Sequence, residues 1–186
     1  SGLFDLTPDD EQQMFIEAGQ AFAADQIRPA ASGADSEKAT PAAILEQAGE
    51  IGVNTLGIPE EFDGVLTEQS TVTWTLMAEA LAHGDMGIAY AALAPGAAAT
   101  AIGRWGDPDQ QASYLPAFTG ENPPAAALAI LEPKPLFDPF NPDTRATAGT
   151  GGHWILNGVK SMVARPGECE LFIVAPATGD ARQTLF

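Results

Sequence analysis

The sequence has a single cysteine, Cys169, only eight lysine and arginine residues, and two histidines among 186 residues. One cysteine excludes an internal disulfide, so a reducing cytoplasm is the expected location. Nucleic-acid phosphates are contacted by clustered basic side chains, so a net charge of −17 argues against a nucleic-acid partner. The same charge disfavours an anionic membrane surface, and no uninterrupted apolar run is long enough to span a bilayer. We therefore expect a soluble cytoplasmic protein.

Motifs that would announce a particular chemistry are also missing. There is no phosphate loop with Gly-Lys-Ser/Thr, no GxGxxG after a predicted strand, and no Cys/His cluster with metal spacing, so no metal is expected. His83 and His153 have no visible nucleophile partner, which argues against a Ser-His-acid hydrolase. Glu132 ends an apolar run, where burial could raise its pKa. A hydrogen-bonded structural carboxylate is the favoured interpretation of Glu132.

The first half of the sequence predicts helices. Apolar residues recur there at helical spacing, between prolines, glycines and acidic capping residues. Small residues dominate residues 89–101, which predicts a buried central helix. We expect helices from Thr7 to Arg28-Pro29, from Thr40-Pro41 to Gly52, from about Thr67 to His83-Gly84, from Asp85 to Ile102 as two helices broken at Pro95-Gly96, and from Asp107 to Leu115-Pro116.

The second half predicts strands. A Gly/Pro-rich joint near residues 120–124 separates the halves, so we expect domains at 1–122 and 123–186. Strand-like runs follow in AAALAIL, in WILNGVKSMVA and in LFIVA. Asn157-Gly158 predicts a tight hairpin inside the second run. The fold class is therefore α+β, and so few strands would leave unpaired edges; we expect a truncated chain or one that something else completes.

Six segments in this order resemble the acyl-CoA dehydrogenase family. They are GIPEEFDG (57–64), MAEALAHGD (77–85), RWGDPDQQASYLPAFTGE (104–121), ILEP (130–133), WILNGVKSMV (154–163) and ELFIVA (170–175). The resemblance implies an N-terminal all-α bundle domain followed by the beginning of a β-barrel-like middle domain, with a C-terminal helical domain absent from this chain.

The resemblance also implies a reaction and its partners. The family uses FAD to dehydrogenate an acyl-CoA thioester between its α and β carbons, in fatty acid or steroid side-chain metabolism. The glutamate that takes the α-proton is expected beyond Phe186, so no catalytic base is assigned here. An electron-transferring flavoprotein is the expected electron acceptor. A homo- or hetero-oligomer of acyl-CoA dehydrogenase subunits is the expected assembly.

Family positions give the candidate binding residues. The cofactor-facing positions are Ile130, Leu131, Met162, Val163 and Ala164, and the substrate-facing positions are Leu136, Phe137 and Asp138.

Several of these residues depart from the family pattern. Leu131 replaces a threonine that reaches the flavin ring, Met162 replaces an aromatic residue, and Ala164 replaces a hydroxyl residue. Leu136-Phe137 replaces a Gly-Ser pair, and a glycine lets the backbone approach a ligand closely. Each lost hydrogen bond to a flavin is worth roughly 0.5–1.5 kcal/mol net.

Two hypotheses of different classes follow. The protein is an FAD-dependent acyl-CoA dehydrogenase with unusual specificity, or it is a non-flavin-binding structural subunit of a heteromeric acyl-CoA dehydrogenase. The changes cluster at flavin-facing positions while motifs such as YLPxxxGE and LNGxK are kept, which favours the second for this chain's own site. Flavin content of the purified protein discriminates the two.

Overall fold

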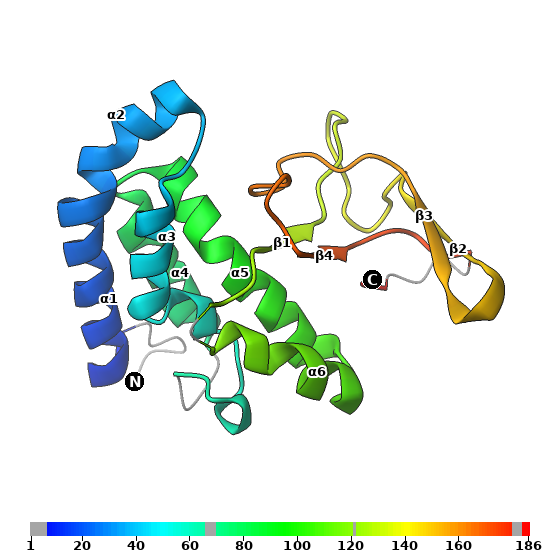
Figure 1. Ribbon diagram of the computed structural model, residues 1–186, viewed down its shortest axis with the longest axis horizontal. Helices are drawn as coiled ribbons and strands as arrows, with labels where there is room; N and C mark the ends of the chain where they lie inside the picture. The colour runs from blue at the N-terminus through cyan, green and yellow to red at the C-terminus, as the bar shows by residue number, and fades with distance from the viewer. Residues whose placement is uncertain (1–6, 66–69, 121, 180–183) are drawn as a thin grey trace. The chain divides into compact units, whose positions relative to one another are not determined.

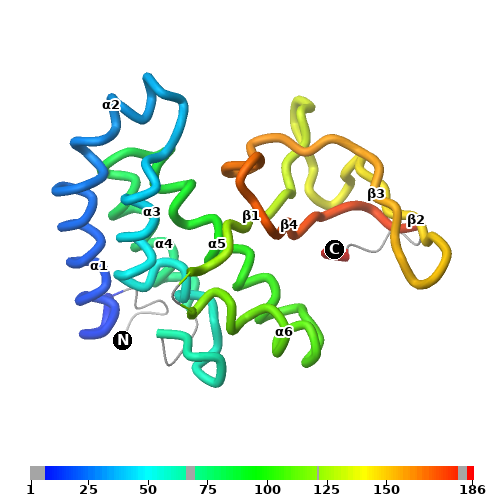
Figure 2. Tube along the Cα trace, in the orientation of Figure 1, coloured from blue at the N-terminus to red at the C-terminus, as the bar shows by residue number. Residues whose placement is uncertain are grey.

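A computed structural model describes residues 7–65, 70–120, 122–179 and 184–186. The chain divides into two compact units, Ser1–Pro123 and Pro124–Phe186. The first contains helices and the second contains short strands and loops (Figures 1 and 2). The α+β class with helices first is therefore confirmed.

The helical unit is organised around its longest helix. That helix, α5 (Met86–Trp105), packs against α3 (Ala42–Glu50), α4 (Thr71–Ala82), α6 (Pro108–Phe118) and the 3₁₀ turn η2 (Val53–Thr55). The small residues of α5 at 89, 91, 92, 94, 98 and 99 are buried, as predicted. Gln12 Nε2 donates to Thr73 Oγ1 at 2.9 Å and so links α1 (Asp10–Phe22) to α4. The elements are α1 (Asp10–Phe22), the π-helical turn η1 (Ala23–Ile27), α2 (Arg28–Glu37), α3 (Ala42–Glu50), the 3₁₀ turns η2 (Val53–Thr55) and η3 (Glu60–Phe62), α4 (Thr71–Ala82), α5 (Met86–Trp105) and α6 (Pro108–Phe118).

The first predicted helix differs from the observed one at both ends. Asp9, not Thr7, is the N-cap, because its carboxylate accepts from the Gln12 N–H at 2.8 Å while Gln12 Oε1 accepts from the Asp9 N–H. The helical backbone does not end at Pro29, because α1 continues through η1 into α2. Pro29 lies in the first turn of α2, where the N–H that proline lacks has no intrahelical partner.

Two other predictions that a proline ends a helix were also wrong. Helix α5 is continuous through Pro95, and α6 continues through Pro116 to Phe118. Pro95 is buried together with its neighbours Ala94 and Gly96, so packing on α5 offsets the missing backbone hydrogen bond. The predicted start of the third helix, Thr67, lies outside the described residues; α4 begins after Ser70, whose hydroxyl accepts from the Thr73 N–H.

The apolar length of α5 also corrects an expectation. By length and composition alone, this helix of 20 residues could cross a membrane, because an 18-residue window within it has a mean hydropathy of 1.4. In the helical unit 61% of that window is buried, as in the core helix of a globular protein. On its own, this helix is therefore a weak indication of a membrane span.

The strand unit contains two separate pairs among its described residues. β1 (Ala126–Ala129) is parallel to β4 (Leu171–Val174), and β2 (Arg145–Ala148) is antiparallel to β3 (Trp154–Asn157), with the 3₁₀ turn η4 (Thr150–Gly152) between β2 and β3. Phe186 and Val174 exchange two backbone hydrogen bonds of 2.7 and 2.9 Å. The sequence therefore located β1, β3 and β4 but missed β2.

The predicted hairpin at Asn157-Gly158 does not form. β3 ends at Asn157 and pairs with β2, so residues 159–163 are not a return strand. A Cβ atom added to Gly158 would lie 2.6 Å from Thr144 Cα. Close approach to Thr144, rather than a tight turn, is therefore what requires glycine here.

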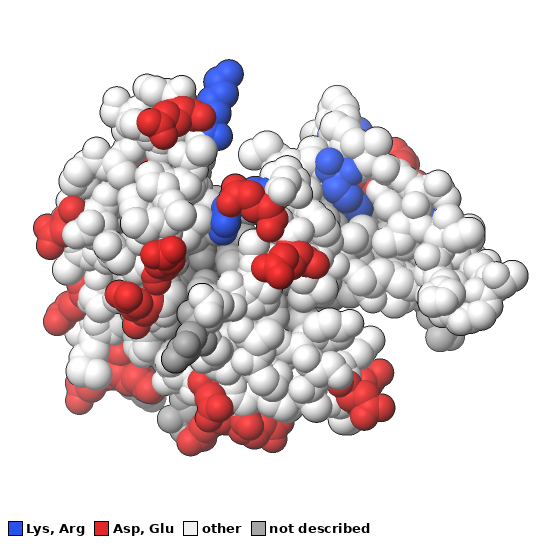
Figure 3. Space-filling model, viewed as in Figure 1, with Lys and Arg blue, Asp and Glu red and all other residues white. Residues whose placement is uncertain are grey.

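The charge of the protein is carried visibly on its surface. Asp and Glu side chains predominate over Lys and Arg on the face drawn in Figure 3. Some of the acidic residues serve helix starts, where the helix dipole favours negative charge: Asp10 and Glu11 in α1 and Asp109 in α6.

Candidate functional site

The two predicted cofactor-facing segments lie side by side in the strand unit. One follows β1 and carries Ile130 and Leu131; the other, residues 161–164, follows Lys160. The Ser161 N–H donates to the Leu131 carbonyl at 2.8 Å. The structure thus brings together residues that are about 30 positions apart in the sequence.

A buried ion pair between Lys160 and Glu132 adjoins this junction, because the two residues neighbour Ser161 and Leu131 in the sequence. Lys160 Nζ is 3.0 Å from Glu132 Oε1, and the two side chains are only 9% and 3% exposed. The ammonium also donates to the Ile130 carbonyl at 2.9 Å and to the Ala175 carbonyl at 2.7 Å. All three N–H bonds of the ammonium are therefore used, and the lysine links the end of β1 to the segment after β4.

Glu132 is a structural carboxylate, but the predicted direction of its pKa was wrong. Burial does act to raise the pKa of Glu132, as expected. The Thr144 side chain, the N–H groups of Asp143 and Thr144, and the Lys160 ammonium together outweigh burial and lower the pKa to about 2. Glu132 therefore stays ionised at neutral pH and is unsuited to act as a proton donor or acceptor there.

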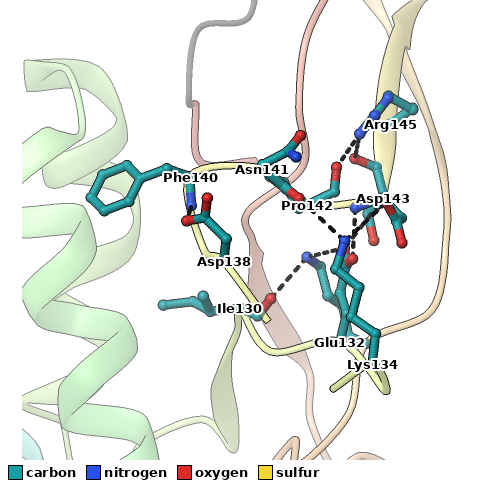
Figure 4. A network of polar contacts seen from close by, with 11 residues as sticks. Ile130, Glu132, Lys134, Asp138, Phe140, Asn141, Pro142, Asp143 and Arg145 are labelled. Carbon is teal, nitrogen blue, oxygen red and sulfur yellow. Dashed lines mark hydrogen bonds and ion pairs between the residues drawn. The ribbon is translucent and has the colours of Figure 1, made fainter. Parts of the chain in front are cut away.

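The two ends of the loop that carries the predicted substrate-facing residues are held together by hydrogen bonds. Glu132 immediately precedes the loop, and its carboxylate accepts hydrogen bonds from the backbone N–H groups of the two residues that follow it, Asp143 at 2.6 Å and Thr144 at 2.9 Å. Outside this buried contact, Lys134 Nζ lies 3.0 Å from Asp143 Oδ1 and donates to the Asn141 carbonyl at 3.3 Å (Figure 4). We call residues 133–142 the closed loop.

The predicted substrate-facing residues lie within the closed loop and differ in exposure and contacts. Leu136 is fully exposed and has a left-handed φ of 52°. Phe137 is partly buried, with the Lys134 ammonium 6.0 Å from its ring centroid. The Asp138 carboxylate accepts the Phe140 N–H at 2.9 Å (Figure 4).

The predicted cofactor-facing side chains offer apolar surface. Leu131 is 47% exposed and Met162 is 72% exposed, whereas Ala164 is buried. Ile130 and Val163 are partly buried. Leu131 and Met162 therefore expose apolar surface, and none of the five side chains can donate a hydrogen bond. At these positions hydrogen bonds to a flavin would have to come from the backbone.

Other chemistries find little support among the described residues. No group of three or more His, Cys, Asp or Glu side chains is placed to hold a metal ion within residues 7–65, 70–120, 122–179 and 184–186. Cys169 is partly buried, and burial raises the pKa of its thiol, which disfavours the reactive thiolate. His153 is exposed.

Lys160 is the residue that the sequence analysis missed. It lies within the WILNGVKSMV segment, but no role was predicted for it. The available signal was a pair of opposite charges in apolar surroundings: Lys160 lies in one apolar run and Glu132 ends another. Buried charges occur in pairs, so the two could have been expected to meet.

Comparison with known proteins identifies the family of the chain. Residues 9–121 match the family model "Acyl-CoA dehydrogenase, N-terminal domain". Curated relatives include the mitochondrial isobutyryl-CoA dehydrogenase of Dictyostelium discoideum, 26% identical over 170 residues, and the mitochondrial short/branched chain specific acyl-CoA dehydrogenase of Bos taurus, 28% identical over 166 residues. These alignments cover 91% and 89% of this chain but only 40% and 37% of the relatives.

Solved structures show the same fold. Butyryl-CoA dehydrogenase from Megasphaera elsdenii superposes with a TM-score of 0.77 at 22% identity, over 94% of this chain and 46% of that one. An acyl-CoA dehydrogenase complexed with FAD from Bacillus anthracis gives 0.75 at 25% identity, over 96% of this chain and 30% of that one. The chain thus spans less than half the length of these relatives. Because the family model matches 9–121 of the 186 residues, the chain belongs to the acyl-CoA dehydrogenase family.

Proposed function

We propose that the protein containing this chain dehydrogenates an acyl-CoA thioester, with FAD as hydride acceptor and an electron-transferring flavoprotein as the next acceptor. The observation that carries this is the junction of Leu131 and Ser161 within a chain of the acyl-CoA dehydrogenase family. Relatives named for isobutyryl-CoA and for short or branched chains suggest a saturated acyl-CoA as substrate class.

The residues of this chain would bind and position rather than transfer protons. The exposed Leu131 and Met162 would pack against the ring faces of the flavin, which supplies the hydride acceptor when bound. The closed loop would contribute Leu136, Phe137 and Asp138 to the substrate side. We assign no catalytic base within this chain; we expect it beyond Phe186.

A second candidate is a structural subunit that does not bind flavin and pairs with a catalytic relative. It is favoured by the lack of any hydrogen-bond donor among the five cofactor-facing side chains. It is also favoured by Leu136, whose bulky side chain stands fully exposed on left-handed backbone at a position where the family has glycine.

The decisive experiment is the flavin absorbance of the full-length protein, purified alone and after co-expression with a candidate partner subunit. Stoichiometric flavin in the protein expressed alone supports the first candidate and excludes the second. Flavin that appears only in the co-expressed assembly supports the second. Melting temperature with and without added FAD checks the result, because a ligand stabilises only the state that it binds.

A reversion variant sharpens the choice. Leu131→Thr supplies one hydroxyl donor at a cofactor-facing position, and Val159→Thr, a similar change at an exposed residue, is the matched control. If the missing donor limits binding, Leu131→Thr should strengthen FAD affinity by about two- to tenfold, as one hydrogen bond allows, and Val159→Thr should not. Equal FAD affinity in both variants would contradict this explanation.

A further inference from the structure

Two kinds of contact hold the candidate site together, and they differ in burial. The exposed pair is Lys134 with Asp143, in which the aspartate side chain is 74% exposed. The buried pair is Lys160 with Glu132, with side chains 9% and 3% exposed. An exposed ion pair contributes little to stability because water and side-chain freedom compete with it.

The attraction between the two charges does not by itself explain the buried pair either. Removing two charges from water costs more free energy than their attraction often returns, so buried ion pairs are weak stabilisers compared with well-packed apolar residues. Their retention is better accounted for when the hydrogen bonds around them specify one arrangement of the backbone. The partners of Lys160 and Glu132 are therefore the informative observation.

Those partners are backbone groups at the edges of the candidate site. Lys160 donates to the Ile130 carbonyl, one residue before the exposed Leu131, and Lys160 itself precedes the 161–164 segment. Glu132 accepts from the N–H groups of Asp143 and Thr144, the two residues that follow the closed loop. One ion pair thus links both predicted cofactor-facing segments and the two ends of the closed loop, which carries the predicted substrate-facing residues.

We propose that Lys160 and Glu132 are positioning residues, whose buried contact holds the two cofactor-facing segments and the closed loop in one fixed arrangement. The inference rests on the proposed function for the identity of the ligands, but the arrangement itself can be measured without them. Neither side chain is placed to touch a ligand; both act through the backbone groups that they bind.

The experiment uses the full-length protein with three variants: Lys160→Met, the double variant Glu132→Gln with Lys160→Met, and the control Lys134→Met. The first readout is amide hydrogen exchange of Ser161, whose N–H bonds to the Leu131 carbonyl and so reports the contact between the two segments. The second is the melting temperature, and the third is affinity for FAD and for butyryl-CoA as probes.

The double variant separates positioning from stability. Lys160→Met leaves Glu132 buried without its cation and should lower the melting temperature; neutralising Glu132 as well should restore much of that loss. If the pair positions the segments, the Ser161 amide exchanges about tenfold faster than in wild type in both variants. A factor of about ten corresponds to the loss of one hydrogen bond. Probe affinity falls by a similar factor. The control Lys134→Met, which removes the exposed ion pair, leaves Ser161 exchange unchanged.

Two results would overturn the proposal. One is unchanged Ser161 exchange in Lys160→Met. The other is recovery of Ser161 exchange together with the melting temperature in the double variant, which would make the pair merely stabilising. If wild-type protein binds neither FAD nor butyryl-CoA, alone or with a partner subunit, the proposed function fails, while the exchange result still decides the role of Lys160 and Glu132.

Discussion

Replacing Glu132 by glutamine should weaken the strand unit in a way that depends on pH. The carboxyl has an ordinary pKa of 4.5 and a pKa of about 2 in the folded chain. A difference of about 2.5 between the two values corresponds to about 3 kcal/mol of stabilisation at neutral pH. The Glu132 side chain is 3% exposed, so solvent screening reduces this little. We therefore expect Glu132→Gln to cost about 3 kcal/mol near pH 7.

The direction of the pH effect follows from the lowered pKa. Because the unfolded carboxyl binds a proton more readily than the folded one, stabilisation is complete above the unfolded pKa and is lost as pH falls towards 2. By about pH 3, roughly 2 kcal/mol should be lost from the wild-type protein. The variant has no carboxylate to titrate at this position, so its free-energy difference from wild type should shrink by the same amount.

Hydrogen exchange of the β4 amides, corrected for the intrinsic effect of pH, measures the opening free energy of the strand unit separately from the helices. Glu168→Gln is the matched control: its carboxylate is paired with Arg165 at 2.8 Å, but the Glu168 side chain is 61% exposed, and we expect little change. A wild-type-to-variant difference that stays constant between pH 7 and pH 3 would refute the assigned pKa of Glu132 and its cause.

Two further substitutions test the packing and the backbone. Gly96→Ala should destabilise the helical unit by about 1–3 kcal/mol, because the added methyl would lie 2.8 Å from the Val53 carbonyl oxygen and from the Trp74 ring. In the control Gly33→Ala the added methyl has nothing within 4 Å, and the change should stabilise the helical unit by about 0.5–1 kcal/mol. Thermal melting followed by circular dichroism of the helices compares the stability of the two variants. Equal changes in stability would contradict the close packing at Gly96. Leu136→Gly should leave the strand unit as stable or more stable by up to about 1 kcal/mol, because Leu136 is fully exposed on left-handed backbone; a clear loss in β4 exchange protection would show that the leucine makes a stabilising contact.

The sequence predicted the existence of elements better than their ends. Helical periodicity located the α-helices other than α2 (Arg28–Glu37), which follows the predicted stop at Pro29, and apolar runs located three strands. Both signals depend on neighbours within a few residues. The errors arose where a distant contact decides. Pro95 was predicted to break a helix, but α5 is buried on both sides of it. Asn157-Gly158 was predicted to turn, but the glycine is required by Thr144, which is distant in sequence.

The site shows the same division. Family positions placed the candidate residues on two segments, and the structure brings those segments together through Ser161 and Leu131. The partners of Glu132 were not predictable, because its pKa depends on N–H groups eleven and twelve residues away and on Lys160. Burial alone, which the sequence did suggest, would have moved the pKa in the opposite direction.

The backbone frame of the candidate site and the side chains that it presents therefore have to be judged separately. Glu132 and Lys160 make four hydrogen bonds to backbone groups that shape the candidate site, and a fifth hydrogen bond joins the two side chains. The side chains that would face a flavin supply apolar surface and no donor. A fold comparison responds to the scaffold, so similarity to FAD-binding structures says little about the ligand surface. If the scaffold is intact, replacing Leu131 by threonine has a preformed frame in which to act, and the response of FAD affinity to that one hydroxyl measures what the surface has lost.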